Sequence, residues 1–237
     1  MGWPNMLVLV RHAESEGNLR SADERAQFEM ATYAYALTPR GRRQAEKTKE
    51  YLQLYFGGNN KYDLSLFFDV RYASYYERSR ETLQIILPSA KFYEPPRLYE
   101  DPRLAEAQRG IYHTMTNDQI EERFPGELAR KAREGLYHYR PLGGENWPDV
   151  ELRIHSFLGT LSRDCDGKNV IMVVHGHWLI LFQRLIHHFS IAEVMAKYKA
   201  GVFENASITI YKNKPVEGCH PHLELVEENI VPWKGLI

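Results

Sequence analysis

Two short apolar runs constrain the fold of this chain more than any other feature of its sequence. Residues 6–10 read MLVLV and are followed at once by Arg11 and His12, while residues 170–174 read VIMVV and are followed by His175. Continuous apolar runs of this length are typical of strands buried on both faces of a parallel sheet. We therefore predict two central strands whose carboxyl ends present basic side chains.

Composition gives the size of the core and excludes some partners. The 237 residues are 43% hydrophobic and 26% charged, which is enough for one well-cored domain that carries an insertion. The formal net charge of -1 gives no overall attraction to nucleic acid or to an anionic membrane, so a preference for anions must come from a local cluster. We expect neither nucleic acid nor a membrane as a partner.

The cysteines and the N-terminus indicate a reducing compartment. Cys165 and Cys219 are too few for a disulfide framework. The opening residues MGWPNM lack the basic and apolar regions of a signal peptide, and no window approaches the roughly 18 consecutive apolar residues of a membrane span. A cytoplasmic location is therefore the default expectation.

Helix and strand patterns alternate along the chain. Thr38 followed by Pro39 is typical of an N-cap with proline at the first helical position, which predicts a helix to about residue 55. The capping-box pattern of Ser190 and Glu193 marks another helix start. Further expected helices span about 77–87, 149–163 and 178–189, and further expected strands span 64–70, 91–98, 207–211 and 223–226.

Residues 101–148 differ in composition from the rest, and we call them the lid segment. Charged residues, Gly and Pro dominate this segment, and the capping-box pattern of Thr116 and Gln119 predicts a short helix. The alternation of strands and helices elsewhere predicts right-handed βαβ units. We therefore expect an α/β fold, a three-layer α/β/α sandwich with a mainly parallel central sheet, in a single domain over residues 1–237 with the lid segment inserted.

The ends of the predicted strands carry a concentrated positive site. Because ligands of parallel sheets bind beyond the carboxyl ends of the strands, Arg11, His12, Arg78 and His175 are expected at one edge. Two arginines there suit a dianionic phosphate. They also favour the neutral form of a neighbouring imidazole, which can attack phosphorus when a hydrogen bond on one ring nitrogen leaves the lone pair on the other.

These residues lie in motifs that resemble the histidine phosphatase superfamily, in its phosphoglycerate mutase-like branch. The motifs, in the family's order, are RHAESEGN at 11–18, SYYERSRET at 74–82, RLAEAQRG at 103–110 and VVHGH at 173–177. GGENWPDVELR at 143–153 is similar to a segment of fructose-2,6-bisphosphatase-like members, with Asn146 in place of their usual Ser. The resemblance covers most of the chain.

The resemblance implies a role for each matching residue. His12 becomes phosphorylated, and Arg11, Arg78 and His175 hold the transferring phosphoryl group. Ser15, Asn18 and Gly176 add contacts to the phosphate. Glu106 donates a proton to the leaving oxygen and later activates water, and a bound dianion should raise its pKa toward neutrality. The resemblance implies neither a metal nor another cofactor, because the arginines supply the positive charge.

Several assignments have competitors in the sequence. Arg80 lies two residues after Arg78, although the spacing from Ser74 favours Arg78. Glu106 competes with three other carboxylates of the same region, and only the RLAE match favours it. Those competitors are Glu100, Asp101 and Glu127.

Two further classes of function are less favoured. A metal hydrolase is suggested by His175 with His177, and by the Cys/His-rich segment at 219–222, although no CxxC or HExxH pattern accompanies them. An inactive binding scaffold is disfavoured because every expected catalytic residue type is present. The pattern assigns no role to His177.

We expect a phosphomonoester hydrolase that acts on a small phosphorylated metabolite, such as a sugar phosphate. We expect the protein to be a monomer or a homodimer. A cofactor-dependent phosphoglycerate mutase is the alternative, because the two activities share the reaction centre and differ in how the lid excludes water. The lid segment lacks the RLNERHYG run of the mutases, which favours hydrolysis. Aromatic residues of the variable segments either line the pocket or form lid core: Tyr33, Tyr35, Tyr112, Tyr137, Tyr139 and Trp147.

Overall fold

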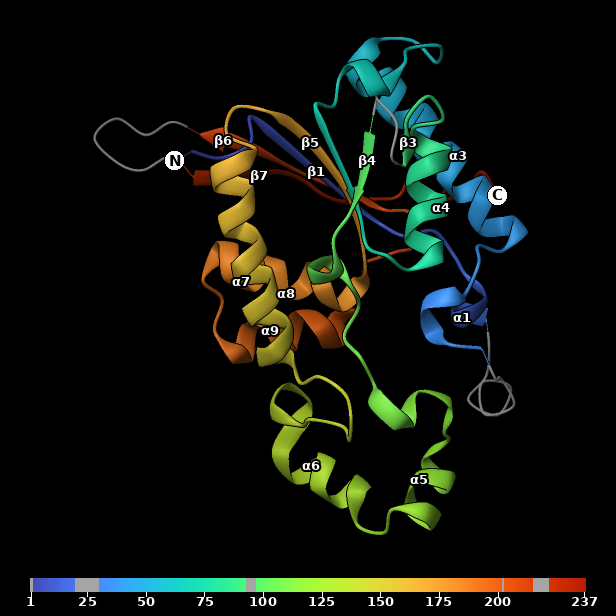
Figure 1. Cartoon of the computed structure of the whole chain (residues 1–237), viewed down its shortest axis with the longest axis vertical. Helices are drawn as coiled ribbons and strands as arrows, with labels where there is room; N and C mark the ends of the chain where they lie inside the picture. The colour runs from blue at the N-terminus through green and yellow to red at the C-terminus, as the bar shows by residue number, and fades with distance from the viewer. Residues whose placement is uncertain (1, 20–29, 93–96, 202, 215–221) are drawn as a thin grey trace.

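A seven-stranded sheet runs through the centre of the molecule (Figure 1). The computed structural model describes residues 2–19, 30–92, 97–201, 203–214 and 222–237. Across the described part the strand order is β3-β4-β2-β5-β1-β6-β7. The strands are β1 (Met6–Arg11), β2 (Val70–Ala73), β3 (Lys91–Phe92), β4 (Arg97–Glu100), β5 (Asn169–Val174), β6 (Ile208–Lys214) and β7 (His222–Ile230).

The pairing of the strands confirms a mainly parallel sheet. Strand β1 lies between β5, to which it is parallel, and β6, to which it is antiparallel. Strand β2 pairs in parallel with both β5 and β4. The carboxyl ends of β1, β2 and β5 therefore meet at one edge, as the apolar runs predicted.

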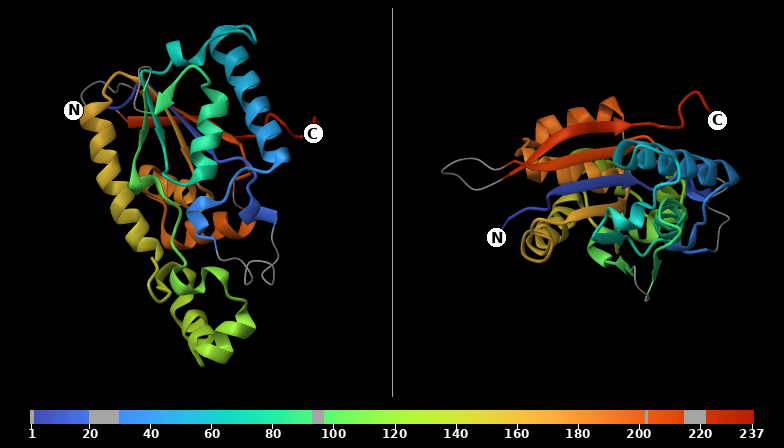
Figure 2. Two further views of the ribbon diagram at one scale, coloured as in Figure 1. Left: turned by 45° about the vertical axis from the view of Figure 1, so that its right-hand side comes forward. Right: turned by 90° about the horizontal axis from the view of Figure 1, so that it is seen from above.

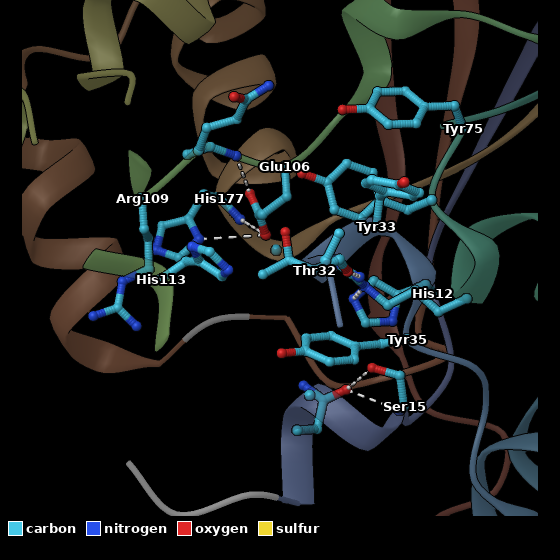
Figure 3. A pocket seen from close by; sticks show the side chains of 18 of the residues that line it. His12, Ser15, Thr32, Tyr33, Tyr35, Tyr75, Glu106, Arg109, His113 and His177 are labelled. Carbon is cyan, nitrogen blue, oxygen red and sulfur yellow. Dashed lines mark hydrogen bonds and ion pairs between the residues drawn. The ribbon is translucent and has the colours of Figure 1, made fainter. Parts of the chain in front are cut away.

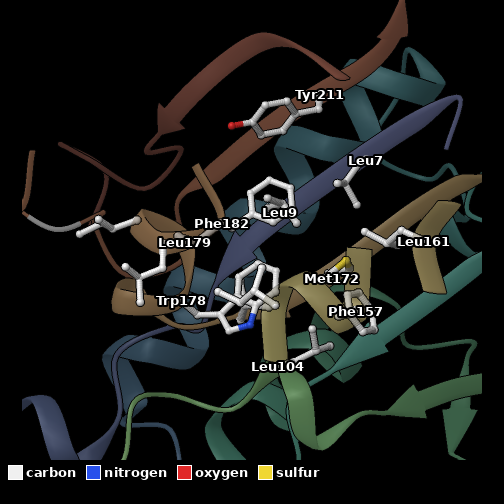
Figure 4. Packing of buried hydrophobic residues seen from close by; sticks show 14 of the residues in the cluster. Leu7, Leu9, Leu104, Phe157, Leu161, Met172, Trp178, Leu179, Phe182 and Tyr211 are labelled. Atoms are coloured by element: carbon white, nitrogen blue, oxygen red, sulfur yellow. The ribbon is translucent and has the colours of Figure 1, made fainter. Parts of the chain in front are cut away.

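Helices cover both faces of the sheet, which confirms the three-layer sandwich (Figures 1 and 2). Alternate side chains of β1 point to opposite faces, because the side-chain period of a strand is two. Leu7 and Leu9 belong to the cluster formed with α7 (Trp147–Asp164), α8 (Gly176–His187) and α9 (Ile191–Ala200) (Figure 4). Val8 and Val10 belong to the cluster formed with α3 (Pro39–Gly57) and α4 (Glu77–Ile86).

The helix starts follow their capping residues. The Thr38 hydroxyl accepts from the amide of Gly41 at the start of α3, and Ser190 forms the expected capping box with Glu193. Helix α7 begins at Trp147, two residues earlier than expected, because Asn146 forms a capping box with Asp149. Helix α8 also begins earlier than expected, at Gly176, directly after His175.

Two predicted strands are wrong in their extent. Residues 64–70 contain the 3-10 helix η2 (Leu64–Leu66), capped by Asp63, and only Val70 enters the sheet. The apolar side chains before Val70 pack as an aromatic cluster rather than as a strand, since the Phe67 ring stacks on Phe56. Residues 91–98 form two separate strands, β3 and β4, which pair in parallel with each other.

The lid segment forms a helical lobe beyond the carboxyl edge of the sheet (Figure 1). It consists of short elements, and the capping box of Thr116 and Gln119 is present at the start of one of them. Across the described residues, no helix is both long and apolar enough to cross a bilayer. The elements of the lobe are η4 (Gly110–Thr114), α5 (Asn117–Arg123) and α6 (Glu127–His138), while η3 (Pro102–Leu104), at the start of the lid segment, packs against α7.

Candidate active site

A pocket of about 610 Å³ brings the predicted site residues together (Figure 3). Its wall combines residues from the end of β1, from the start of α4 and from the lid segment. His175 is fully buried behind this wall, with its ring centroid 5.0 Å from that of His12. The predicted residues that line the pocket are Arg11, His12, Ser15, Asn18, Arg78, Glu106 and Gly176.

His12 has a defined tautomer. Its Nδ1 lies 2.7 Å from the carbonyl oxygen of Ala13, and because a carbonyl only accepts, Nδ1 must carry the proton. The lone pair is therefore on Nε2, which accepts from Arg78 Nε at 3.2 Å. Burial, together with the nearby charges of Arg78, His175 and Arg11, holds the pKa of His12 well below its ordinary value. The ring is thus neutral near pH 7.

Arg78 connects both histidines to the pocket wall. Besides its bond to His12, its Nη1 donates to the carbonyl oxygen of Thr32 at 2.8 Å, and its Nη2 lies 3.5 Å from His175 Nδ1. The Arg78 guanidinium also lies over the Tyr76 ring, 4.4 Å from its centroid. One buried guanidinium therefore orients several groups at once.

His175 is held by Ser74, the first residue of the SYYERSRET motif. The Ser74 hydroxyl lies 2.9 Å from His175 Nε2. Since Nδ1 faces the donor Nη2 of Arg78, Nε2 is the nitrogen that carries the proton and donates to Ser74. Burial and the charge of Arg78 lower the pKa of His175 well below its ordinary value.

Thr82, the last residue of the same motif, joins α4 to the end of β1. Its hydroxyl donates to the carbonyl oxygen of Arg78 at 2.6 Å. The Thr82 hydroxyl oxygen also accepts, at 3.0 Å, from the amide of Ala13, the residue directly after His12. Each of Ser74, Arg78 and Thr82 thus contacts one of the two histidines or the residue directly after His12.

Arg11 and Asn18 complete the side of the pocket nearest β1. Arg11 Nη1 donates to the carbonyl oxygen of Phe203, while its Nε is buried and has no partner among the described residues. A buried guanidinium N–H of this kind suits an anionic oxygen. Asn18 Oδ1 accepts from the amide and the hydroxyl of Ser15, at 2.9 and 3.0 Å.

Glu106 forms an ion pair with His177, which the sequence analysis left without a role. Its Oε2 lies 3.3 Å from His177 Nδ1 and accepts from the His177 amide at 3.4 Å. Burial alone would raise the pKa of Glu106, but His177 and His175 hold it well below its ordinary value. Burial would lower the pKa of His177, but the charge and hydrogen bond of Glu106 raise it.

The expected rise in the pKa of Glu106 refers to the site with a bound dianion, and it stays a prediction. The protein groups alone act in the opposite direction, because His177 lies against the carboxylate. The start of α8 further favours the ionised form of Glu106, because the first amides of a helix carry partial positive charge and the His177 amide donates to this carboxylate. With the protein groups alone around it, the pair keeps its proton on His177.

The backbone that leads to Glu106 is fixed by the core. The carbonyl oxygen of Arg103 accepts from the indole of Trp178 at 2.9 Å and from Arg153 Nη1 at 2.8 Å. Trp178 is fully buried. Farther along the lid segment, Glu145 accepts from the amide of Gln108 at 3.1 Å. The RLAE motif and the GGENWPDVELR segment thus hold each other in place.

The competitors of Arg78 and Glu106 lie in other ion pairs, and none lines the pocket. Arg80 pairs with Glu77 and with Glu100. Asp101 pairs with Arg103, and Glu127 pairs with Arg130.

The metal-site alternative gains no support from the described residues, in which no group of three or more His, Cys, Asp or Glu side chains could hold a metal ion. His177 faces Glu106, and His175 faces Ser74 and Arg78. Most of the segment at 219–222 lies outside the described residues, and only its last residue, His222, is described, at the start of β7.

The aromatic residues of the variable segments divide into two groups. Tyr33 and Tyr35 line the pocket. The other four are buried and do not line it. The hydroxyl groups of Tyr137 and Tyr139 donate to Glu151 and Glu127, respectively. The buried, non-lining residues are Tyr112, Tyr137, Tyr139 and Trp147.

Sequence reasoning missed part of the pocket wall. The RLAEAQRG motif contains Gln108 and Arg109, and SYYERSRET contains Tyr75 and Tyr76, so position within a matched motif was the available signal. His113 lies outside every motif, and nothing in the sequence distinguished it from other histidines.

Comparison with known proteins agrees with this geometry. The family model described as histidine phosphatase superfamily, branch 1, matches residues 7–220. The chain belongs to the histidine phosphatase superfamily. Among its relatives, the chain is 32% identical over 184 residues to the phosphoglycerate mutase-like protein AT74 of Arabidopsis thaliana, covering 73% of this chain and 54% of that protein. It thus spans about half the length of that relative.

Another relative is matched over most of its length. The chain is 27% identical over 194 residues to the 2,3-bisphosphoglycerate-dependent phosphoglycerate mutase of Rhizobium etli, covering 80% of this chain and 84% of the mutase. Among solved structures, a mycobacterial glucosyl-3-phosphoglycerate phosphatase complexed with VO3 shares the fold, with a TM-score of 0.66, 23% identity, and coverage of 95% and 99% of the two chains.

Proposed function

We propose that this protein hydrolyses phosphomonoesters of small metabolites, without a metal ion, through a phosphohistidine intermediate on His12. The observation that carries the proposal is the tautomer of His12. Its Nδ1 donates to the Ala13 carbonyl at 2.7 Å, so the lone pair lies on Nε2, where it accepts from Arg78 Nε until the phosphoryl group takes that place. A neutral, oriented imidazole is the form that can act as a nucleophile.

In the first step the Nε2–P bond forms while the P–O bond of the ester breaks. Arg11 and Arg78 stabilise the charge on the transferring phosphoryl group, because preorganised donors act strongly where water is excluded. The leaving oxygen takes the proton held by the Glu106–His177 pair. The dianion raises the pKa of Glu106 as it binds, so the proton moves from His177 to the carboxyl group that faces the ester.

In the second step water hydrolyses the phosphohistidine. Glu106 accepts a proton from the water molecule as its oxygen bonds to phosphorus, and the Nε2–P bond breaks with its electron pair returning to His12. Inorganic phosphate leaves, and the enzyme regains the protonation state with which it began. Arg11 and Arg78 provide the positive charge that a metal ion provides in other phosphatases.

A phosphoglycerate mutase is the second candidate, since the Rhizobium etli relative is named as one. A mutase must keep water away from the phosphoenzyme until the phosphoryl group returns to the bound intermediate. Hydrolysis is favoured by the lid segment, whose sequence lacks the RLNERHYG run, and by the name of the mycobacterial structural neighbour, a phosphatase. We also propose that the protein acts in the cytoplasm.

The test is phosphate release from glycerol phosphates, sugar phosphates, nucleoside monophosphates and phosphoglycerates, in excess chelator, together with trapping of a phosphorylated protein. We expect turnover and a base-stable, acid-labile phosphoprotein. His12→Ala should abolish the label and lower turnover by at least about 10³-fold. Turnover that survives His12→Ala would contradict the nucleophile, and loss of turnover in chelator that metal restores would contradict the metal-free mechanism.

The mutase alternative is tested with the same protein. Interconversion of 2- and 3-phosphoglycerate that depends on 2,3-bisphosphoglycerate and releases no net phosphate would replace hydrolysis with the mutase reaction.

A further inference from the structure

Tyrosine rings form one continuous side of the pocket. They come from two segments, the 3-10 helix η1 (Thr32–Ala34) with the residue after it, and the turn between β2 and α4. Figure 3 shows Tyr33 and Tyr75 on the opposite side of the pocket from Arg109 and His113. We call the four rings the tyrosine wall, which consists of Tyr33, Tyr35, Tyr75 and Tyr76.

Three of these rings form a path from the buried histidines to the outer part of the pocket. The Tyr76 ring centroid lies 4.9 Å from that of His175, and 4.9 Å from that of Tyr75. The Tyr75 centroid in turn lies 6.2 Å from that of Tyr33. Exposure rises along the path, since Tyr76 is 4% exposed and Tyr33 is 52% exposed. The outer rings therefore present aromatic surface that a ligand can cover.

The tyrosine wall is tied to the phosphate site by Arg78. Its Nη1 donates to the carbonyl oxygen of Thr32, next to Tyr33, and its guanidinium lies over the Tyr76 ring. The same side chain donates to His12. The position of the rings relative to the nucleophile is thus set by one buried residue, which suits a substrate with a phosphoryl group and a ring at a fixed separation.

The size of the pocket leaves room for such a substrate. A volume of about 610 Å³ lies within the range of pockets that enclose drug-sized ligands, roughly 300–1,000 Å³. The phosphoryl group occupies only the end near His12. The remaining volume lies between the tyrosine wall and the lid segment, so the leaving group of the ester meets aromatic rings on one side.

We propose that the preferred substrates are phosphomonoesters whose leaving group carries a planar aromatic or heteroaromatic ring, which packs against Tyr33 and Tyr75. This inference rests on the proposed phosphatase function. Aromatic rings attract one another in offset-stacked or edge-to-face arrangements, beyond the benefit of burying apolar area. Burial of the Tyr33 ring contributes most to this preference, because Tyr33 is the most exposed of the three rings on the path.

Three esters of matched shape test the inference. Benzyl phosphate, cyclohexylmethyl phosphate and glucose 6-phosphate each carry a six-membered ring on a CH₂–O–phosphate group, so the leaving groups are all primary alcohols. They differ in whether the ring is aromatic, saturated and apolar, or saturated and hydroxylated. We expect kcat/KM for benzyl phosphate to exceed that for each of the other two by about fivefold or more.

Variants of the tyrosine wall show where the preference arises. Tyr33→Leu and Tyr75→Leu should each lower the ratio of kcat/KM for benzyl over cyclohexylmethyl phosphate toward one. Tyr33→Phe keeps the ring and should retain the ratio. Tyr55→Leu is the matched control, because Tyr55 is also an exposed tyrosine in ring contact with a neighbour but does not line the pocket. It should leave all three rates unchanged.

The outcomes separate the inference from the proposed function. Equal kcat/KM for the three esters, the highest value for glucose 6-phosphate, or a benzyl preference that survives both leucine variants would overturn the inference alone. Absence of phosphate release from every phosphomonoester would overturn the proposed function and this inference with it.

Discussion

The carboxylate of Glu106 and the imidazole of His177 face each other at the N-terminal end of α8. Glu106 Oε2 lies 3.3 Å from His177 Nδ1, and both side chains line the pocket. The pKa of His177 is raised and that of Glu106 is lowered, so the pair carries its proton on the imidazole. The charges of Arg11 and Arg109 oppose Glu106, because they lower the pKa of His177.

His177→Asn should shift the pH profile of kcat/KM. Protonation of the leaving oxygen requires the pair to hold one proton, and the wild-type pair loses that proton only as pH rises through the raised pKa of His177. In the variant the last proton leaves from Glu106, a carboxyl group with a lower pKa. The basic limb should therefore move to lower pH by about one unit or more.

The control for this profile is His155→Asn, because His155 is exposed on α7 and does not line the pocket. The ionisation of the substrate is the same for all variants, so a difference between them reports on the protein. An unchanged basic limb in His177→Asn, with a rate that falls equally at every pH, would show that His177 has only a structural role.

Arg78→Lys should lower kcat/KM by about 10²–10³-fold, the range for loss of a preorganised donor. Arg78 uses Nε, Nη1 and Nη2 toward His12, Thr32 and His175, and a single ammonium group cannot reproduce this geometry. Arg80→Lys is the matched control on the same helix, since Arg80 pairs with Glu77 and Glu100 outside the pocket. Equal losses in the two variants would contradict the assignment.

Ser74→Ala should reduce both stability and turnover. Removal of the hydroxyl leaves the buried Nε2–H of His175 without its acceptor, which costs about 1–3 kcal/mol in the free energy of unfolding. Turnover should fall about 10- to 100-fold, by analogy with the loss of hydrogen-bond partners behind metal-bound histidines.

Ser79→Ala is the matched control that separates the loss of stability from the loss of turnover. Urea unfolding measures the first, and steady-state assays measure the second. Ser79 is equally buried and donates to the carbonyl oxygen of Val173, away from the histidines. It should lose stability and keep its turnover. If the two serine variants lose turnover to the same extent, His175 does not depend on Ser74 for its orientation.

Gly110→Ala should raise KM, because Gly110 packs directly against the backbone of residues 142–144 in the lid segment. Gly110 has a φ of +56°, and a Cβ there would lie 2.0 Å from the carbonyl oxygen of Leu142. Gly126→Ala is the control, with a φ of +84° and nothing within 4 Å of its Cβ. Both variants lose about 1–2 kcal/mol of stability from the left-handed backbone, measured by urea unfolding.

Only Gly110→Ala should also displace the pocket wall, since Gly110 and Gly143 line the pocket. Its KM for a phosphomonoester should therefore rise about tenfold or more, a loss typical of small misplacements at an active site. A KM that matches that of Gly126→Ala would mean that this contact does not shape the pocket.

The parts of the site that follow from local pattern were predictable from the sequence. An apolar run predicts a buried strand wherever it occurs, and the position of Arg11, His12 and His175 at strand ends requires only that the strands be parallel. Ser74 and Thr82 were recognisable only because their spacing from Arg78 matches a family motif. The contact of Ser74 with His175 follows from the ends of neighbouring strands, whereas that of Thr82 with Ala13 joins α4 to the end of β1.

The parts that depend on packing between distant segments were not predictable. The run at 64–70 has the composition of a strand, but its aromatic rings pack on α3, and only Val70 enters the sheet. The contact of Glu106 with His177 joins residues 71 positions apart, and it lowers the pKa of Glu106 in a way that no local pattern indicates. Likewise, no local pattern distinguishes Tyr33, in the pocket, from Tyr137, in the lid core.

The hydroxyl of Thr82 has a consequence for how substrate preference can diverge. By bonding to the Arg78 carbonyl and the Ala13 amide, it couples Arg78 to the proposed nucleophile His12, two residues 66 positions apart in the chain. These two hydrogen bonds fix the start of α4 against the end of β1, independently of the lid segment. Substitutions in the lid segment or the tyrosine wall can then alter which esters are accepted while the chemical step is inherited intact.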